Sequence, residues 1–249
     1  MTAFPPLPLA APAASLPPIE RAALLLDLDG TLLDLAPAPD LVVVPEGLPE
    51  ALLGLRTRLG DALGVISGRP VEQVDALFPD IPFAVAGEHG GALRRAPGAP
   101  IERLPLPELP ARWIAAAERL AEARPGVLLE RKRRGFTLHY RAVPQHAEAL
   151  RLAVADLLAG HADRFALLPA HMAWEVRPIG ADKGKAVAEI MAREPFAGRR
   201  PVFIGDDVTD EDAIAAAQAV GGIGLRVPEA FGDAAGVRAW LARAARRAM

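Results

Sequence analysis

Short apolar runs alternate with helical segments in the first part of the chain, from Arg21 to about Arg95. The segments "AALLLDLDG", at 22–30, and "DALGVISGR", at 61–69, each hold a continuous apolar stretch, which is typical of strands covered on both faces. Pro70 suits the first turn of a helix over "VEQVDALF", and "PFAVAGEHGG", at 82–91, is a third apolar run. Strands that alternate with helices in this way predict a parallel α/β sheet.

A different pattern occupies the middle of the chain. Residues 107–126 and 144–160 predict two helices with Pro and Gly stops. Each is followed by a predicted hairpin, "VLLE" with "GFTLHYR" and then "RFALLPA" with "MAWEVRP". Helix, hairpin, helix and hairpin form an antiparallel α+β unit. The first pattern resumes after Pro178, so we expect this unit to be inserted into the larger one. The expected division is a Pro-rich flexible leader at 1–20, a core at 21–97 and 178–249, and an inserted domain at 98–177.

Composition narrows the classes of partner. The formal charge of −3, from 28 basic and 31 acidic residues, gives no basic field for nucleic acid. The absence of cysteine excludes disulfides, thiolate metal sites and thiol nucleophiles. No apolar run approaches the ~18 residues of a membrane helix. We therefore expect a cytoplasmic protein, and in the simplest case a monomer, that acts on a small molecule; "APAAS" in the leader leaves a cleaved signal peptide as the alternative.

Two aspartates follow the first predicted strand at once. Ligands of open α/β sheets bind beyond the carboxyl ends of the strands, and Asp27 and Asp29, two residues apart, point to the same side of an extended backbone. A carboxylate there can attack phosphorus and form an aspartyl-phosphate, with the second carboxylate as its acid/base partner. The alternative is an ordinary Asx-type turn after a strand.

The segment "GDDVTDED" places five acids in eight residues after another predicted strand. Asp210, Glu211 and Asp212 are accounted for as acids at a helix N-terminus, where the helix dipole favours them. That reading leaves Asp206 and Asp207 unexplained. Together with Asp27 they predict an oxygen-rich site suited to Mg²⁺.

Two further polar residues suit phosphate. Ser67 ends a predicted strand, where a hydroxyl and free amides can hold a phosphate oxygen, although Ser-Gly also forms ordinary turns. Only three of the 28 basic residues are lysines, namely Lys132, Lys183 and Lys185. Lys183 begins a predicted helix and there supplies a compact charge that arginine does not. Its alternative is an exposed surface lysine.

In the order "DLDGTL", "SGR", a Lys at a helix start and "GDD…D", the chain resembles the haloacid dehalogenase-like phosphohydrolase superfamily. The resemblance implies a Rossmann-like core with an inserted C2-type cap, Asp27 as nucleophile and Asp29 as general acid/base. The residues that it implies for phosphate are Asp27, Ser67, Gly68 and Lys183. The ligands that it implies for Mg²⁺ are Asp27, Asp29 through its backbone carbonyl, Asp206 and Asp207.

The segments "GEHG", "ERKRRGFTLHYR" and "WEVRP…KGKA" further resemble the trehalose-6-phosphate phosphatase family. This implies hydrolysis of trehalose 6-phosphate, with the substrate bound by Arg69, Glu88, His89, Glu130, Lys132, His139, Arg141 and Glu175. For the cap residues the alternative is a solvent-exposed charged hairpin. For the function, the alternatives are a phosphatase of another sugar phosphate, such as sucrose 6-phosphate or a glycosyl-phosphoglycerate, and a noncatalytic protein that binds a sugar phosphate or a trehalose-phosphate synthase.

Overall fold

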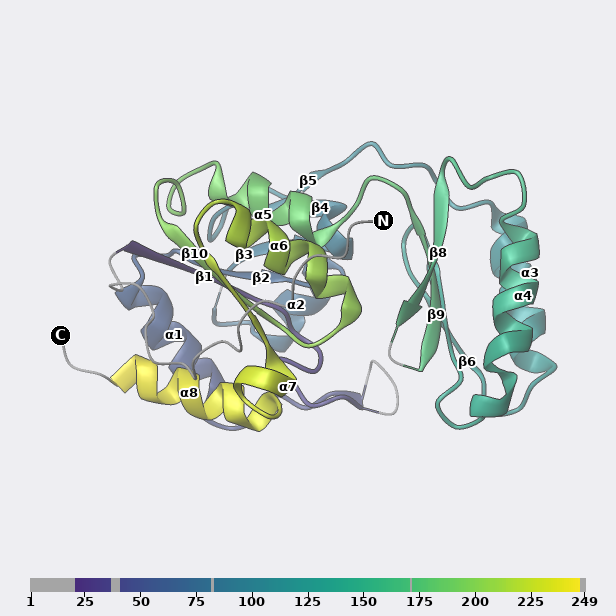
Figure 1. The fold of residues 1–249 in the computed structure, drawn as a ribbon, viewed down its shortest axis with the longest axis horizontal. Helices are drawn as coiled ribbons and strands as arrows, with labels where there is room; N and C mark the ends of the chain where they lie inside the picture. Colours follow the sequence, from purple (N-terminus) through teal and green to yellow (C-terminus); the bar gives the residue numbers. More distant parts are fainter. Residues whose placement is uncertain (1–20, 37–40, 82, 171, 247–249) are drawn as a thin grey trace.

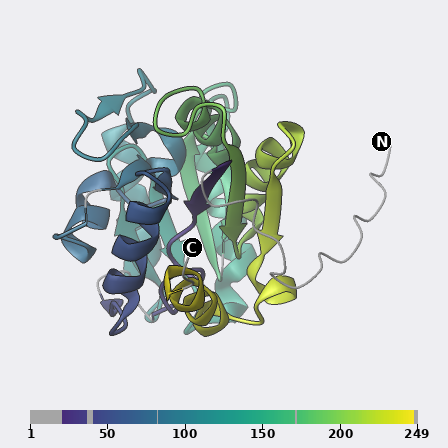
Figure 2. The same ribbon diagram turned by 90° about the vertical axis from the view of Figure 1, so that its left-hand side faces the viewer.

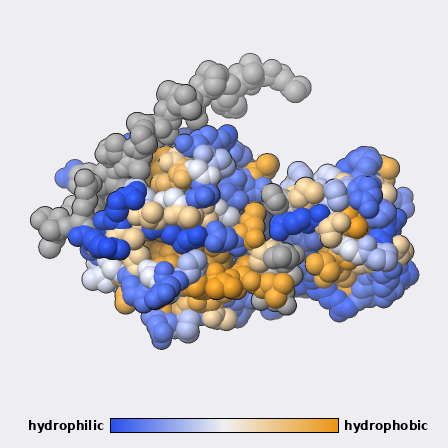
Figure 3. Space-filling model, turned by 90° about the horizontal axis from the view of Figure 1, so that it is seen from below, coloured by the Kyte–Doolittle hydropathy of each residue, from blue (hydrophilic) through white to orange (hydrophobic). Residues whose placement is uncertain are grey.

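The computed structural model describes residues 21–36, 41–81, 83–170 and 172–246, so the leader expected at 1–20 lies outside the described residues. Figure 1 shows two lobes side by side, a larger one built on a long twisted sheet and a smaller one built on a second sheet. Seen from below, a waist separates the lobes, and hydrophobic residues gather on the larger lobe toward that waist (Figure 3). Within the described residues, no helix has the length and apolar character that crossing a membrane requires.

The sheet of the larger lobe has seven strands, in the order β11-β10-β1-β2-β3-β4-β5. Their bounds are β1 Ala22–Leu26, β2 Leu63–Ile66, β3 Ala84–Gly87, β4 Ala92–Arg94, β5 Glu102–Arg103, β10 Arg200–Gly205 and β11 Ile223–Arg226. β1 is an interior strand, with every residue buried, and pairs in parallel with β10 and β2. Consecutive apolar residues without alternation therefore did indicate a strand covered on both faces, as expected.

One end of this sheet is antiparallel. The apolar run at 82–91 contains β3 and a 3₁₀ turn over Glu88–Gly90, and β4 begins directly after it and returns beside β3. β5 pairs antiparallel with β4, so the large sheet reaches Arg103, inside the range 98–177 expected for the inserted domain. The predicted α/β class is confirmed by this sheet and the separate antiparallel one; the domain boundaries stay a prediction.

Helices cover both faces of the large sheet. Their bounds are α1 Leu48–Arg58, α2 Val71–Leu77, α5 Lys183–Met191, α6 Glu211–Ala219, α7 Val227–Ala230 and α8 Ala234–Arg246. α1 packs on α8 at one face, and α5 packs on α6 at the other (Figures 1 and 2). Sequence reasoning missed α1, whose pattern Gly54 weakens; contact with α8 supplies the burial that stabilises it.

The smaller lobe is a four-stranded antiparallel sheet in the order β6-β7-β9-β8, backed by two helices. The bounds are β6 Leu128–Arg131, β7 Phe136–His139, β8 Phe165–Ala170, β9 Ala173–Pro178, α3 Ala111–Glu122 and α4 Ala147–Leu157. Both predicted hairpins and both predicted helices are present. Trp113, Phe136 and Phe165 fill the core between helices and sheet. Because α3 and α4 lie on the outer side, the opposite face of the sheet is turned toward the larger lobe (Figure 1).

Candidate active site

Asp27 lies directly beyond β1, at the carboxyl edge of the sheet. Its amide donates to the carbonyl of Ile204, which continues the pairing of β1 with β10 for one residue and fixes the backbone there. Gly30 then turns the chain with φ 85°, and a Cβ at this position would lie 2.1 Å from Oδ2 of Asp206. Glycine is therefore required both for the turn and for the approach of a second carboxylate to Asp27.

Lys183, the first residue of α5, neutralises part of this acidic edge. Its Nζ donates to Oδ1 of Asp27 and to Oδ1 of Asp210, both at 2.6 Å, and its side chain is buried. Burial by itself lowers the pKa of Lys183, but attraction to the two carboxylates outweighs this and raises the pKa above its ordinary value. Lys183 is thus a fixed, charged group beside Asp27, not the surface lysine of the alternative interpretation.

Three carboxylates converge at this edge. Oxygen atoms of Asp27, Asp206 and Asp210 lie within 4.8 Å of one another. Burial raises the pKa of Asp27 well above its ordinary value, and Asp210 raises it further, while Lys183 opposes the shift. Burial, followed by repulsion from Asp210 and Asp207, raises the pKa of Asp206 to about 6. Lys183 supplies one positive charge against these three carboxylates, so the cluster is negative when all three are ionised.

A divalent cation that prefers oxygen ligands would compensate the excess negative charge of these carboxylates. Mg²⁺ is held in proteins by one or two carboxylates together with waters and substrate phosphate. Asp27 and Asp206 offer such carboxylates, and Thr31 donates to Oδ1 of Asp206 at 3.2 Å, which orients it. The donor set therefore fits the predicted metal.

Sequence reasoning treated Asp210 as an acid at a helix N-terminus and missed its place in this cluster. Asp210 is completely buried, and its Oδ2 accepts the backbone amides of Asp206 and Asp207, both at 3.0 Å. The signal available was its position four residues after Asp206, which lets one side chain reach back across the loop. The carboxylate of Asp207 accepts the amide of Val208 at 2.7 Å and caps the next turn, so its role as a metal ligand stays a prediction.

The loop after β2 carries Ser67, Gly68 and Arg69 beside the aspartates. Ser67 is buried, and its Oγ accepts the amide of Arg69 at 3.1 Å, which makes the tight turn. The Arg69 guanidinium donates to both oxygens of Asp29, each at 2.7 Å. The predicted acid/base carboxylate is therefore held by a two-pronged ion pair, a contact that the sequence did not suggest.

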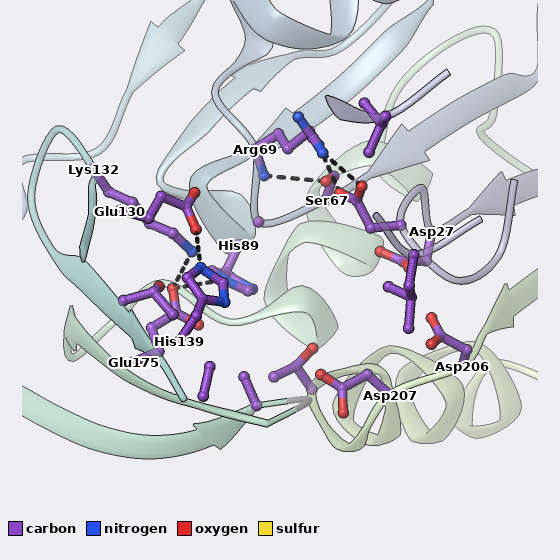
Figure 4. A pocket seen from close by; sticks show the side chains of 18 of the residues that line it. Asp27, Ser67, Arg69, His89, Glu130, Lys132, His139, Glu175, Asp206 and Asp207 are labelled. Carbon is purple, nitrogen blue, oxygen red and sulfur yellow. Dashed lines mark hydrogen bonds and ion pairs between the residues drawn. The ribbon is translucent and has the colours of Figure 1, made fainter. Parts of the chain in front are cut away.

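The smaller lobe contributes the opposite wall. Glu130 of β6, Thr137 of β7 and Glu175 of β9 lie opposite one another across three neighbouring strands, so their side chains share one face of the sheet. His139 pairs with Glu130 at 2.9 Å, and Lys132 donates to Glu175 at 2.6 Å (Figure 4).

Two other predicted substrate contacts are placed differently. Arg141 donates to the backbone carbonyl of Ala36 at 2.9 Å, across the boundary between the lobes. Glu88 pairs with Arg103 at 2.8 Å and does not line the cavity described next.

These walls enclose a cavity of about 170 Å³ between the lobes. Of the predicted site residues, all except Glu88 line it, namely Asp27, Asp29, Ser67, Gly68, Arg69, His89, Glu130, Lys132, His139, Arg141, Glu175, Lys183, Asp206 and Asp207. Thr137 and Thr209 line it as well and were not predicted. A charged, oxygen-rich floor on the large lobe thus faces a polar wall on the small lobe.

The structure has an α/β core with a buried aspartate after its first strand, a lysine beside it and an acidic loop after a neighbouring strand, which is the arrangement that the resemblance to haloacid dehalogenase-like phosphohydrolases predicts. A solved structure described as a haloacid dehalogenase-like hydrolase, from Bacteroides thetaiotaomicron, has a TM-score of 0.60 at 13% identity, covering 90% of this chain and 99% of that chain. The chain belongs to the trehalose-phosphatase family, whose model matches residues 25–229.

Individual relatives agree with this membership. The trehalose-6-phosphate phosphatase of Escherichia coli (strain K12) is 40% identical over 202 residues, which are 81% of this chain and 75% of that protein. The solved C-terminal domain of trehalose-6-phosphate phosphatase from C. albicans has a TM-score of 0.75 at 20% identity, covering 91% of this chain and 92% of that chain. The latter likeness concerns the fold.

Proposed function

We propose that this protein is a Mg²⁺-dependent phosphatase that hydrolyses trehalose 6-phosphate to trehalose and phosphate. The observation that carries the proposal is the position of Asp27, which is buried against Lys183 at the floor of a cavity whose far wall holds Glu130 and Glu175. The floor suits a phosphate, and the wall suits sugar hydroxyls, because carboxylates accept their hydrogen bonds and cationic groups donate to them. The named relatives support the same substrate.

The reaction takes two steps. In the first, an oxygen of Asp27 attacks phosphorus, the bond from phosphorus to the sugar oxygen breaks, and Asp29 gives its proton to that oxygen, so that trehalose leaves. In the second, Asp29 takes a proton from a water molecule, the resulting hydroxide attacks phosphorus, and the bond to Asp27 breaks, which releases phosphate. Oδ1 of Asp27 is already engaged by Lys183, so Oδ2 is the oxygen left for attack.

Asp29 must leave Arg69 before it does this work. Each of its oxygens accepts a hydrogen bond from the guanidinium, and the ion-paired carboxylate carries no proton to give to the leaving sugar oxygen. The bound substrate supplies negative charge that competes for Arg69. Asp27, Asp206 and the backbone carbonyl of Asp29 would hold Mg²⁺, which when bound would compensate charge on the transferring phosphoryl group.

Phosphate release by the purified protein tests the proposal. Trehalose 6-phosphate is expected to be hydrolysed in the presence of Mg²⁺ and to stay intact when EDTA replaces the metal. Release that is unaffected by EDTA contradicts the metal requirement. The absence of release under every metal condition favours the noncatalytic alternative, a protein that binds a sugar phosphate or a synthase.

Mg²⁺ is also expected to raise the temperature of thermal unfolding, and more strongly above pH 6 than below it. Burial, with repulsion from neighbouring carboxylates, raises the pKa values of Asp27 and Asp206, so ionising them in the metal-free fold costs stability. Stability is then lost as pH rises through about 6, and a bound cation restores it. Asp206→Asn is expected to reduce the Mg²⁺ effect, whereas Asp212→Asn, at an exposed position, is the matched control. A rise that is equal at both pH values speaks against this cluster as the site.

Truncation of the polar wall is expected to separate recognition from chemistry. Alanine variants should lower kcat/KM for trehalose 6-phosphate by about 10–10³-fold, as one lost charged hydrogen bond and poorer closure predict, while most of the slow hydrolysis of a small aryl phosphate persists. The control is Arg131→Ala, because the Arg131 side chain is largely exposed and pairs with Glu118. An equal loss on both substrates would place the residues in catalysis or folding instead. The variants are Glu130→Ala, Lys132→Ala, Arg141→Ala and Glu175→Ala.

A further inference from the structure

His89 connects three parts of the molecule through one tight turn. It lies in the 3₁₀ turn between β3 and β4, where both Glu88 and His89 have positive φ, a conformation that L side chains rarely adopt. The amide of His89 donates to the carbonyl of Ser67 at 3.0 Å, which ties the turn to the phosphate-binding loop. The same turn packs on α5, the helix that begins with Lys183.

The imidazole of His89 extends from the large lobe to a side chain of the small lobe. It is buried, and its Nε2 lies 3.1 Å from Oε1 of Glu175 (Figure 4). It also lies directly over Gly68, where a Cβ would be 2.7 Å from Nε2. A side chain at residue 68 would therefore displace the ring from Glu175.

The two oxygens of the Glu175 carboxylate differ in their hydrogen bonds. Oε1 accepts from both His89 and Lys132, and no hydrogen bond to Oε2 is found within the described residues. Burial lowers the pKa of His89 to about 4, against the pull of Glu175, so the ring is neutral near pH 7. A carboxylate only accepts, which assigns the ring proton to Nε2. Burial raises the pKa of Glu175, but attraction to His89 and Lys132 lowers it well below its ordinary value and keeps it an acceptor.

We propose that His89 is a positioning residue for substrate recognition: by fixing Oε1 of Glu175 it leaves Oε2 to accept a sugar hydroxyl, and it holds this carboxylate in register with the phosphate-binding loop at Ser67 and Gly68. This inference rests on the proposed function, because it assigns Glu175 to the sugar. His89 touches neither phosphorus nor the leaving oxygen in this role. It acts through Glu175.

Two substitutions at His89 separate this role from a structural one. Glutamine places an amide nitrogen near the imidazole Nε2 and retains a donor for Glu175, whereas asparagine places its amide near Nδ1 and falls short. Asparagine nevertheless adopts positive φ more readily than glutamine. If His89 is needed only for the turn, His89→Asn should therefore retain more activity than His89→Gln. If His89 is needed as a hydrogen-bond donor, His89→Gln should retain more.

Steady-state kinetics on trehalose 6-phosphate, with thermal unfolding of each variant, tests the assignment. His89→Asn is expected to raise KM by about 10–100-fold with a smaller change in kcat, and His89→Gln to stay within about threefold of the parent protein, as loss and retention of a hydrogen bond to a charged group predict. The kcat/KM of the double variant His89→Asn, Glu175→Gln is expected to be no lower than that of the more impaired single variant. The loss on an aryl phosphate is expected to be smaller than the loss on the sugar phosphate.

A variant that leaves His89 unchanged provides a second route. Gly68 is not among the described glycines with positive φ, so its backbone tolerates alanine, and the new methyl group displaces the imidazole. Gly68→Ala is expected to raise KM in the parent protein and to add little in the His89→Asn background.

Any one of three results overturns the inference. The first is activity of His89→Asn equal to or above that of His89→Gln, and the second is additivity of the effects of His89→Asn and Glu175→Gln. The third is an equal loss of activity on trehalose 6-phosphate and on the aryl phosphate. A parent protein inactive on trehalose 6-phosphate instead overturns the proposed function. The same variants are then compared on the sugar phosphate that the parent does hydrolyse.

Discussion

Replacing Asp27 with asparagine is expected to abolish phosphate release from trehalose 6-phosphate, with kcat reduced by about 10⁴-fold or more. The amide has nearly the same shape as the carboxylate, but it cannot form an acyl phosphate and it removes one ligand of the metal cluster. The fold is expected to survive, because burial and Asp210 already disfavour a charge at this position. Single-turnover phosphate release and thermal unfolding of the same preparation measure the two effects.

The matched control for this substitution is Asp80→Asn. Asp80 is exposed, follows α2 and lies outside the cavity, so the same chemical change there is expected to leave turnover intact. Turnover of Asp27→Asn within tenfold of the parent would refute Asp27 as the nucleophile. Loss of turnover together with loss of cooperative unfolding would show that Asp27 is needed for the fold.

Lys183→Arg is expected to fail although it keeps the positive charge. The ammonium group fits between Asp27 and Asp210 with two hydrogen bonds of 2.6 Å and almost no solvent exposure. A guanidinium is larger and planar, so it either displaces the two carboxylates or leaves them unpaired. We expect kcat/KM to fall by about 10²–10³-fold on both trehalose 6-phosphate and an aryl phosphate, because the charge acts on the phosphoryl group that the two share.

Lys185→Arg is the control for this change. Lys185 lies two residues further along α5, its side chain is 68% exposed, and its ion pair with Asp182 lies in solvent. Its replacement is expected to leave both activities near those of the parent. Near-parental activity of Lys183→Arg would contradict the assigned role, and a loss confined to the sugar phosphate would move Lys183 from catalysis to recognition.

The features that could be predicted from the sequence are those that depend on local pattern. In an α/β chain, the apolar run before Asp27 predicts a buried strand whose carboxyl end carries the polar residues. Both hairpins of the small lobe follow from short apolar strands around turn residues. The insertion of the small unit could be predicted because the strand–helix pattern stops and then resumes.

The features that could not be predicted depend on contacts between distant segments. The contact of Asp210 with Lys183, 27 positions away, depends on the fold, and its local contact with two amides has no signature beyond a spacing that a helix dipole explains equally well. The ion pair of Arg69 with Asp29 joins residues 40 positions apart, and that of Glu88 with Arg103 depends on where β5 joins the sheet. In both cases the sequence shows a charged residue, while its partner is set by the fold.

The measurement that tests the central claim most directly is competition between substrates in one reaction. Equal concentrations of trehalose 6-phosphate, sucrose 6-phosphate and a glycosyl-phosphoglycerate are incubated with the parent protein and Mg²⁺, and the dephosphorylated sugars are quantified at early times, so that the ratio of products equals the ratio of kcat/KM values. A wall built to bond particular hydroxyls rejects sugars that leave its polar groups unpaired, so we predict that trehalose forms faster than either competitor product by about 10²-fold or more. Equal rates, or a preference for either competitor, would contradict the assignment of trehalose 6-phosphate as the substrate.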